Sequence, residues 1–240
     1  MYFVFCNLCF PSGALSARAV PRRVGEMRVI ITCGPSYEPI DGVRRLTNFS
    51  TGRLGLLLAA ELSRAGHKVI CMKGEGAVSH GDAGAARVIP FSTNANLLER
   101  LREFSGDDAG AVFHAAALCD YEVKSVRASD GALMTARKIP TLAGELTLTL
   151  KPALKLLPEL RAIFPAAKIV GWKYELNGNR NAAETKAREQ IFANGTHACV
   201  VNGAAWGEGF GFIEPGREVV PLADKPALCA LLARWIAAGK

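Results

Sequence analysis

Residues 27–72 read MRVIITCGPSYEPIDGVRRLTNFSTGRLGLLLAAELSRAGHKVICM, and this stretch carries one complete strand–loop–helix–strand unit. Its opening run, 27–34, is short, rich in β-branched residues and ended by glycine, which predicts a buried strand. Leucines recur at helical spacing over residues 52–66, and the run ends in glycine, as helices often do. A second apolar run, 68–72, follows directly. Two such strands joined by a helix indicate a parallel sheet.

The rest of the chain repeats this alternation. We expect further strands at 86–91, 110–117, 145–150, 167–172, 197–202 and 217–222, and helices at 94–106, 152–164, 181–194 and 224–239. The pattern predicts an α/β fold: a Rossmann-like three-layer sandwich, with a mostly parallel sheet and helices on both faces. Residues 118–144 lack clear periodicity, which is typical of a functional or mobile substrate loop.

Composition favours a globular protein that binds small anions. Of the 240 residues, 50% are hydrophobic and 21% are charged, and the formal net charge is +7. Lys and Arg are scattered, without a basic run interleaved with aromatic residues, so a nucleic-acid surface is not expected. No apolar run reaches the roughly 18 residues that a membrane helix needs. We therefore expect phosphates or nucleotides as ligands, and neither nucleic acid nor a membrane as a partner.

The first 26 residues differ from the remainder, and three interpretations of them stay open. A short apolar start is followed by small residues, proline and arginine, whereas a secretory signal places its positive charge before the apolar segment. The segment is a misassigned start with Met27 as the true first residue, a disordered extension, or a targeting peptide. Residues 27–240 are expected to form a single Rossmann-like domain.

Cysteine and histidine usage argues against disulfides and against metal ligands in the chain. The seven cysteines are an odd number, and several lie in apolar runs, which fits buried free thiols in a reducing, cytoplasmic compartment. Cys6 and Cys9 form one C-x-x-C without the second ligand pair that zinc needs. The four histidines also lack metal spacing.

Polar or aromatic residues follow several expected strands, where parallel sheets bind ligands. Gly34 lets backbone amides approach an anion, and Ser50 or Thr51 can cap the helix whose free N–H groups favour a phosphate. The other candidate ligand-binding residues are Asp120, Lys138, Trp172 and Asn202. Asn202 precedes a glycine-rich turn. Each also has an ordinary structural explanation, as a turn, a core residue or a solvated lysine. Their convergence on one edge is the stronger signal.

A nicotinamide cofactor is an alternative ligand for the loop before the first helix. The dinucleotide fingerprint requires G-x-G-x-x-G soon after the first strand, but only Gly52 and Gly55 match it, loosely. An acidic residue should end the second strand, and Glu75 comes late. No Walker or G-x-S-x-G motif is present. An NAD(P)-binding reductase therefore fits poorly, and it leaves Asn48 unexplained.

Residues 31–55, ITCGPSYEPIDGVRRLTNFSTGRLG, resemble the opening signature of phosphopantothenoylcysteine synthetases, roughly I-T-x-G-x-T-x-E-P-[IL]-D-x-V-R-x-[IL]-[ST]-N-x-S-[ST]-G-[KR]-x-G. Later stretches are similar to further family segments, in the family's order: AAALCDYEV (115–123), RKIP (137–140), VGWKYE (170–175) and VVNGAAWGEGFG (200–211). The resemblance implies a Rossmann-like ligase of coenzyme A biosynthesis in its stand-alone form.

The resemblance also implies a two-step reaction. CTP or ATP activates the carboxylate of 4′-phosphopantothenate as an acyl-nucleotidylate and releases pyrophosphate, and the amine of L-cysteine then attacks the acyl carbon. Mg²⁺ and basic groups are needed to neutralise charge on two anionic substrates. The family is generally dimeric, so we expect a homodimer.

Roles for individual residues follow from the same resemblance. Asn48 matches the family's essential asparagine, Arg44 a functional arginine, and Lys138 the lysine of a mobile loop on the triphosphate. Matches to nucleotide-binding positions are Gly34, Ser50, Thr51, Gly52, Asp120, Lys138, Trp172 and Asn202; matches to substrate-binding positions are Arg44, Asn48, Ala117, Lys186 and Arg188. The chain departs from the family at Trp172, usually phenylalanine, and after Lys138, where further lysines are absent. The preference for CTP or ATP therefore stays open.

Overall fold

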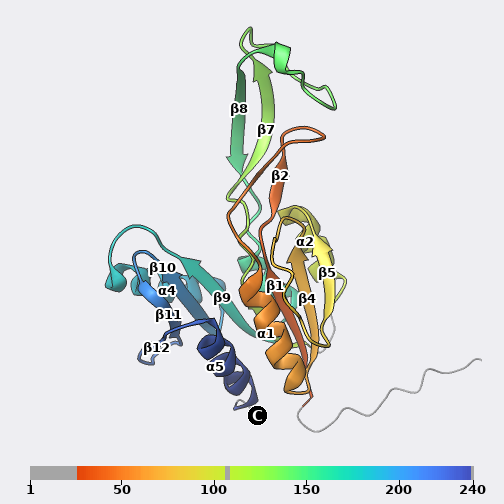
Figure 1. Cartoon of the computed structure of the whole chain (residues 1–240). Helices are drawn as coiled ribbons and strands as arrows, with labels where there is room; N and C mark the ends of the chain where they lie inside the picture. Colours follow the sequence, from red (N-terminus) through yellow and green to blue (C-terminus); the bar gives the residue numbers. More distant parts are fainter. Residues whose placement is uncertain (1–25, 106–108, 239–240) are drawn as a thin grey trace, which may run out of the picture.

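The computed structural model describes residues 26–105 and 109–238, and its centre is an eight-stranded sheet (Figure 1). The strands, in their order across the sheet, are β12 (Val220–Leu222), β11 (Gly207–Ile213), β10 (Ala198–Gly203), β9 (Lys168–Tyr174), β6 (Ala109–His114), β1 (Arg28–Cys33), β4 (Lys68–Gly74) and β5 (Arg87–Phe91). The six strands from β10 to β5 pair in parallel, whereas β11 and β12 are antiparallel. The parallel strands alone follow the order 3-2-1-4-5-6 of doubly wound dinucleotide-binding sheets.

Helices cover both faces of the sheet and make three layers. On one face, α1 (Arg53–Arg64) and α5 (Lys225–Ala237) pack their leucines against β1 and β6. On the other face lie α2 (Asn94–Arg102), α3 (Leu160–Ile163) and α4 (Arg180–Asn194). Successive residues of β1, such as Ile30 and Ile31, point into opposite cores, which is why the strand reads as a continuous apolar run. The predicted α/β three-layer fold is confirmed.

A two-stranded arm extends from the carboxyl edge of the sheet (Figure 1). It consists of β7 (Tyr121–Ala128) and β8 (Leu146–Pro152), which pair antiparallel. The buried amide of Asn94 joins the two roots of the arm, because its Nδ2 donates to the carbonyls of Cys119 (2.9 Å) and Leu154 (3.0 Å). A shorter hairpin, β2 (Tyr37–Pro39) and β3 (Arg45–Thr47), lies between β1 and α1 in the chain.

Three predicted elements differ from the structure. Residues 118–144, expected as an irregular loop, contain β7, a strand of mostly exposed or half-buried residues that exists because β8 pairs with it. The helix expected at 152–164 begins only with a 3-10 turn, η2 (Leu157–Glu159), because Pro158 has no N–H to bond within a longer helix. The stretch after Asn202, expected as a glycine-rich turn, contains β11, whose antiparallel partner β10 holds it in the sheet.

The expectation of buried free thiols is confirmed for five cysteines: Cys33, Cys71, Cys119, Cys199 and Cys229. Cys6, Cys9 and nearly all of the N-terminal extension lie outside the described residues. Over 26–105 and 109–238, no helix combines the length and the apolar character that crossing a membrane requires.

Candidate active site

The carboxyl ends of β1 and β6 lie side by side where the strand order reverses, which is where doubly wound sheets bind ligands. The Ala117 N–H donates to the Gly34 carbonyl at 2.9 Å, and the Ser36 N–H donates to the Ala117 carbonyl at 3.3 Å. These bonds fix the two loops against each other. Two predicted site residues, Gly34 and Ala117, are thereby brought together.

Gly34 and Gly52 allow the backbone to turn sharply below the start of α1. Their φ values are 78° and 73°, in the left-handed region that favours glycine. A Cβ on Gly34 would lie 2.7 Å from the Cβ of Ala77, and a Cβ on Gly52 would lie 3.6 Å from the Cα of Gly34. A side chain at either position would therefore crowd Ala77, whose Cβ would also lie only 3.0 Å from a Cβ on Gly52.

The start of α1 offers backbone donors to a ligand. Gly52 is the N-cap residue rather than Ser50 or Thr51, and it has no side chain to cap the helix. The Thr51 hydroxyl accepts from the Arg53 N–H at 3.3 Å. The N–H groups of a helix start that lack intrahelical partners, together with the helix dipole, suit a phosphate.

Asn48 connects the loop before α1 to the segment after β6. Its Nδ2 donates to the Leu118 carbonyl at 2.8 Å and lies 3.5 Å from the Ala117 carbonyl. The side chain is exposed, so a ligand at the strand ends can contact it. An amide donor keeps its charge state at every pH and can stabilise negative charge on an acyl oxygen.

Arg44 and Lys138 lie at a different place, where the β2–β3 turn meets the arm loop. Arg44 donates from Nε to Asp41 Oδ2 at 3.0 Å and from Nη2 to the Ile139 carbonyl at 2.5 Å. The Ile139 N–H donates to the same Asp41 oxygen at 3.1 Å. Arg44, and then the Val43 N–H, hold the pKa of Asp41 far below its ordinary value. Lys138 is exposed beside this junction. Arg44 thus contacts the arm loop, whereas Asn48 contacts the segment after β6.

A second polar group lies at the carboxyl ends of β9 and β10. Glu175 accepts from Lys186 Nζ at 2.6 Å and pairs with Lys173 at 3.3 Å. The Lys186 bond is the main reason that the pKa of Glu175 is lowered. The Glu175 N–H donates to the Asn202 carbonyl at 2.9 Å, which brings Asn202 and Lys186 to one place. Trp172, on β9, packs against the α1–α5 core and also lines the cavity at the root of the arm.

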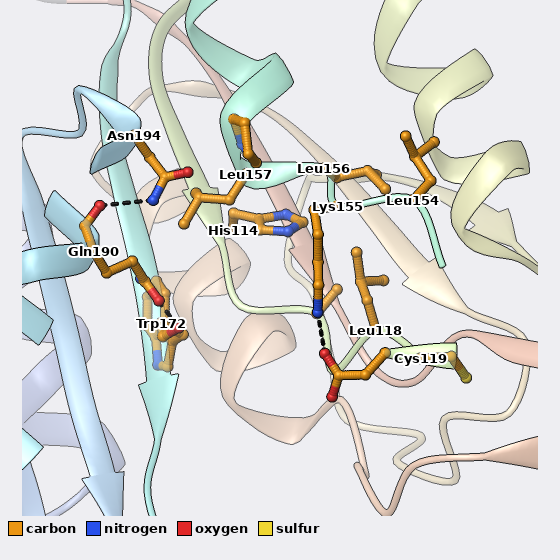
Figure 2. A pocket seen from close by; sticks show the side chains of 13 residues that line it. His114, Leu118, Cys119, Leu154, Lys155, Leu156, Leu157, Trp172, Gln190 and Asn194 are labelled. Atoms are coloured by element: carbon orange, nitrogen blue, oxygen red, sulfur yellow. Dashed lines mark hydrogen bonds and ion pairs between the residues drawn. The ribbon is translucent and has the colours of Figure 1, made fainter. Parts of the chain in front are cut away.

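A cavity of about 270 Å³ opens at the root of the arm, on the α4 face of the sheet (Figure 2). Asp120 and Lys155 form an ion pair in its wall, and His114, Leu118 and Gln190 also contribute to it. The His114 Nδ1 lies 2.7 Å from the Thr32 hydroxyl. Burial lowers the pKa of His114 to about 4, so its imidazole is neutral at pH 7.

Residues 24–227 match the family model of the DNA/pantothenate metabolism flavoprotein C-terminal domain, DFP. The chain belongs to the DFP family. It is 32% identical to the coenzyme A biosynthesis bifunctional protein CoaBC of Bacillus subtilis over 184 residues, and 27% identical to that of Thermococcus kodakarensis over 183. Each alignment covers 76% of this chain and 42% of the relative, so the chain spans less than half the length of these relatives.

Solved structures share the DFP fold. The DNA/pantothenate metabolism flavoprotein from Streptococcus pneumoniae superposes with a TM-score of 0.78 at 21% identity, over 89% of this chain and 100% of that one. A Cab2 mutant in complex with phosphopantothenate-cysteine superposes with a TM-score of 0.65 at 18% identity, over 88% and 85%. Neither the DFP match nor the curated relatives support the nicotinamide-dependent reductase.

A further predicted residue of this DFP domain, Arg188, also lies apart from the residues at the strand ends. Arg188 donates to Glu184 and to the carbonyls of Glu214 and Arg217, near the turn after the antiparallel strand β11. On α4 it is two residues from Lys186, and a helix turns successive side chains by about 100°, so the two point in different directions.

Asp41, Lys155 and Glu175 belong to these clusters and were not among the predicted site residues. Glu175 stands at the end of VGWKYE, directly after an expected strand, so its position was a usable signal. Lys155 falls within the helix that was wrongly expected at 152–164, and Asp41 falls in a loop for which no secondary structure was predicted. Over the ranges described, no group of three or more His, Cys, Asp or Glu side chains is placed to hold a metal ion.

Proposed function

We propose that this protein is a phosphopantothenate–cysteine ligase of coenzyme A biosynthesis. A nucleoside triphosphate activates the carboxylate of 4′-phosphopantothenate as an acyl-nucleotidylate, and L-cysteine then forms the amide. Support comes from the DFP family match, from two relatives named for coenzyme A biosynthesis, and from a structural neighbour solved in complex with phosphopantothenate-cysteine.

The position of Asn48 carries the proposal. A carboxylate is a poor electrophile until a phosphoanhydride supplies a leaving group, and charge then develops on the acyl oxygen during attack. Asn48 offers an amide donor at the strand ends, next to the Gly34–Gly52 turn and the open start of α1. A phosphate at that helix start and an acyl group at Asn48 would therefore lie side by side.

The nucleotide is CTP or ATP in this proposal, with Trp172, Asn202 and Asp120 near its base and sugar and Lys138 on its phosphates. Mg²⁺ would arrive bound to the triphosphate, since the described ranges hold no cluster of three or more metal-ligating side chains. When bound, it would offset phosphate charge as the α-phosphorus is attacked. Lys186, held by Glu175, adds a further cation at the same edge.

We also propose a cytoplasmic homodimer without nucleic-acid or membrane partners. The β2–β3 turn and the arm loop expose large apolar side chains: Val43 (65%), Leu133 (54%) and Leu142 (99%). Apolar side chains gathered on a projecting arm are better explained by a second copy than by solvent. Light scattering at working concentration should give twice the chain mass, and the monomer mass would refute the dimer.

Residues 27–240 are proposed to work as one synthetase unit, with residues 1–26 dispensable. Limited proteolysis of the full chain, followed by mass spectrometry, should remove the N-terminal segment first and leave ligase activity unchanged. Loss of activity on that first cleavage would overturn this assignment.

One assay tests the ligase function directly. Protein, Mg²⁺, L-cysteine and 4′-phosphopantothenate are mixed with CTP or ATP in turn, and pyrophosphate and the amide product are followed. We expect stoichiometric release of both with at least one nucleotide. Absence of product with every nucleoside triphosphate would refute the function.

A further inference from the structure

Asn94, the first residue of α2, carries a buried amide that helix capping does not need. The residue is 3% exposed, and α2 is capped by Thr93, whose side chain accepts from the Asn96 N–H at 3.2 Å. The Asn94 Nδ2 donates instead to the carbonyls of Cys119 at 2.9 Å and Leu154 at 3.0 Å. Its Oδ1 has no hydrogen-bond partner among the described residues. The amide therefore stabilises the structure through its two N–H donors.

The two carbonyls belong to the residues directly before Asp120 and Lys155. These two charged side chains pair with each other at the root of the arm (Figure 2). The Ala153 N–H also donates to the Asp120 carbonyl at 2.9 Å, so the two chain segments are bonded at backbone level. Asn94 thus fixes both segments one residue before a charged side chain.

The side chains of Asp120 and Lys155 need this support because they are exposed, by 69% and 61%. An exposed ion pair holds its members only weakly, and ordering a free side chain on a ligand costs entropy. The strands β7 and β8 that continue from this root form a two-stranded ribbon projecting from the sheet (Figure 1). Since such a ribbon has little stability alone, the placement of Asp120 depends on the bonds at the root.

We propose that Asn94 is a positioning residue for nucleotide binding, which fixes the root of the arm so that Asp120 meets the base and sugar of the nucleotide. This rests on the proposed function, which places Asp120 there. Asn94 is too buried to touch the ligand, and it acts through the carbonyls of Cys119 and Leu154. An Asp120 held in place in advance binds without the ordering cost that a free root would add.

Asn94→Ala tests this role through the balance of KM and kcat. Asp120 is assigned to parts of the nucleotide that do not react, so its contact stabilises the ground state and the transition state alike. We expect the KM for the nucleotide to rise about tenfold, the effect of one charge-assisted hydrogen bond, with kcat within about twofold. Loss of folded protein alone would lower the apparent kcat and leave the KM unchanged. An unchanged nucleotide KM would overturn the inference.

Asn96→Ala is the matched control on the same helix. The Asn96 Oδ1 accepts from the Ser92 N–H at 3.2 Å, so this bond stays at the start of α2. The variant should keep both the nucleotide KM and kcat. An equal rise in the nucleotide KM of the two variants would trace the effect to α2 rather than to the arm, against the inference.

A double-mutant cycle shows whether Asn94 acts through Asp120. Asp120→Ala should itself raise the nucleotide KM about tenfold. Adding Asn94→Ala should then raise it no further, because the side chain that Asn94 positions is already gone. A rise of about a hundredfold in the double variant would mean that the two residues act independently, and the proposed role would be wrong.

Asn94→Asp keeps the test decisive where Asn94→Ala does not fold. Burial favours the protonated acid, which has the size of the amide and offers one O–H donor in place of two N–H donors. We expect a nucleotide KM between those of the unmodified protein and Asp120→Ala. A KM equal to that of the unmodified protein would show that the root bonds are dispensable for binding.

The outcomes separate this inference from the proposed function. Absence of amide product from the unmodified protein with every nucleotide would refute the ligase function itself. An active ligase in which Asp120→Ala leaves the nucleotide KM unchanged would overturn the role of Asn94 and leave the ligase function standing.

Discussion

Asn48 donates to the Leu118 carbonyl across 2.8 Å and so joins the loop before α1 to the segment that follows β6. The two segments are 70 residues apart in the sequence, and the reversal of strand order between β1 and β6 brings them together. Asn48, the proposed hydrogen-bond donor to the acyl oxygen, therefore lies at the ligand-binding crevice of the fold.

Asn48→Ala should abolish most turnover and preserve nucleotide binding. Removing one donor to a developing oxyanion typically lowers kcat by roughly 10²–10³-fold. The backbone at the start of α1 is unchanged by this substitution, so the nucleotide Kd should stay within about twofold. Product formation and calorimetric nucleotide titration measure the two effects. Asn181→Ala, on the exposed surface of α4, is the control, and full activity of Asn48→Ala would contradict the assignment.

Gly34→Ala should destabilise the protein more than Gly66→Ala. Both glycines have positive φ, 78° and 88°, where a Cβ costs roughly 1–2 kcal/mol. Nothing lies within 4 Å of a Cβ built on Gly66, whereas one on Gly34 would lie 2.7 Å from the Cβ of Ala77. Urea midpoints should therefore fall for both variants and furthest for Gly34→Ala, and only that variant should lose nucleotide affinity. Equal midpoints would mean that the Gly34 backbone relaxes freely.

The parallel sheet was predictable because its strands carry local signals. RVIITC is a continuous apolar run rich in β-branched residues, and the leucines of α1 recur at helical spacing, so both signals are visible without reference to any partner. The strand β7 has no such signal, since most of its residues are exposed or half-buried and it depends on β8, which begins 18 residues after it ends. β11 contains three glycines and likewise depends on pairing across a turn.

The candidate site likewise contains residues that could be predicted from the sequence and contacts that could not. Gly34 was predicted from its position at the end of a recognisable strand, whereas the role of Asn48 was predicted from the family resemblance. The contacts of Arg44 with the arm loop and of Lys155 with Asp120 depend on how that arm folds back, which no local pattern records. Tertiary contacts of long basic side chains are therefore the part of the site that sequence reasoning could not supply.

Glu175→Gln should lower stability at neutral pH and have less effect in acid. The pKa of Glu175 is lowered in the folded state. Its carboxylate therefore stabilises the fold above the pKa of the unfolded chain, about 4.3, and this contribution is lost as the pH falls through the folded-state pKa. We expect a difference of about 1 kcal/mol at pH 7, since two lysines pair with Glu175. Urea unfolding from pH 7 downward should show the gap narrowing below about pH 5.

The control for this effect is Glu61→Gln, which removes a surface pair with Arg64 on α1. That pair should contribute less than about 0.5 kcal/mol. A gap between Glu175→Gln and the unmodified protein that widens in acid would contradict the ion-pair explanation.

Asp41→Ala should release the loop that carries Lys138. Asp41 accepts from Arg44 and from the Ile139 N–H, so one carboxylate attaches residues 137–139 to the β2–β3 turn. Without it, the peptide bonds after Arg137 and Lys138 should become better trypsin substrates, because cleavage requires local opening. Asp130→Ala is the matched control, since Asp130 accepts from the Ala132 N–H at the other end of the same loop. Faster cleavage in both variants would mean that the whole loop opens as one unit. Unchanged cleavage in Asp41→Ala would show that the remaining contacts, which are the buried Ile139 side chain and the bonds from Gly42 and Arg44 to loop carbonyls, are enough to secure it.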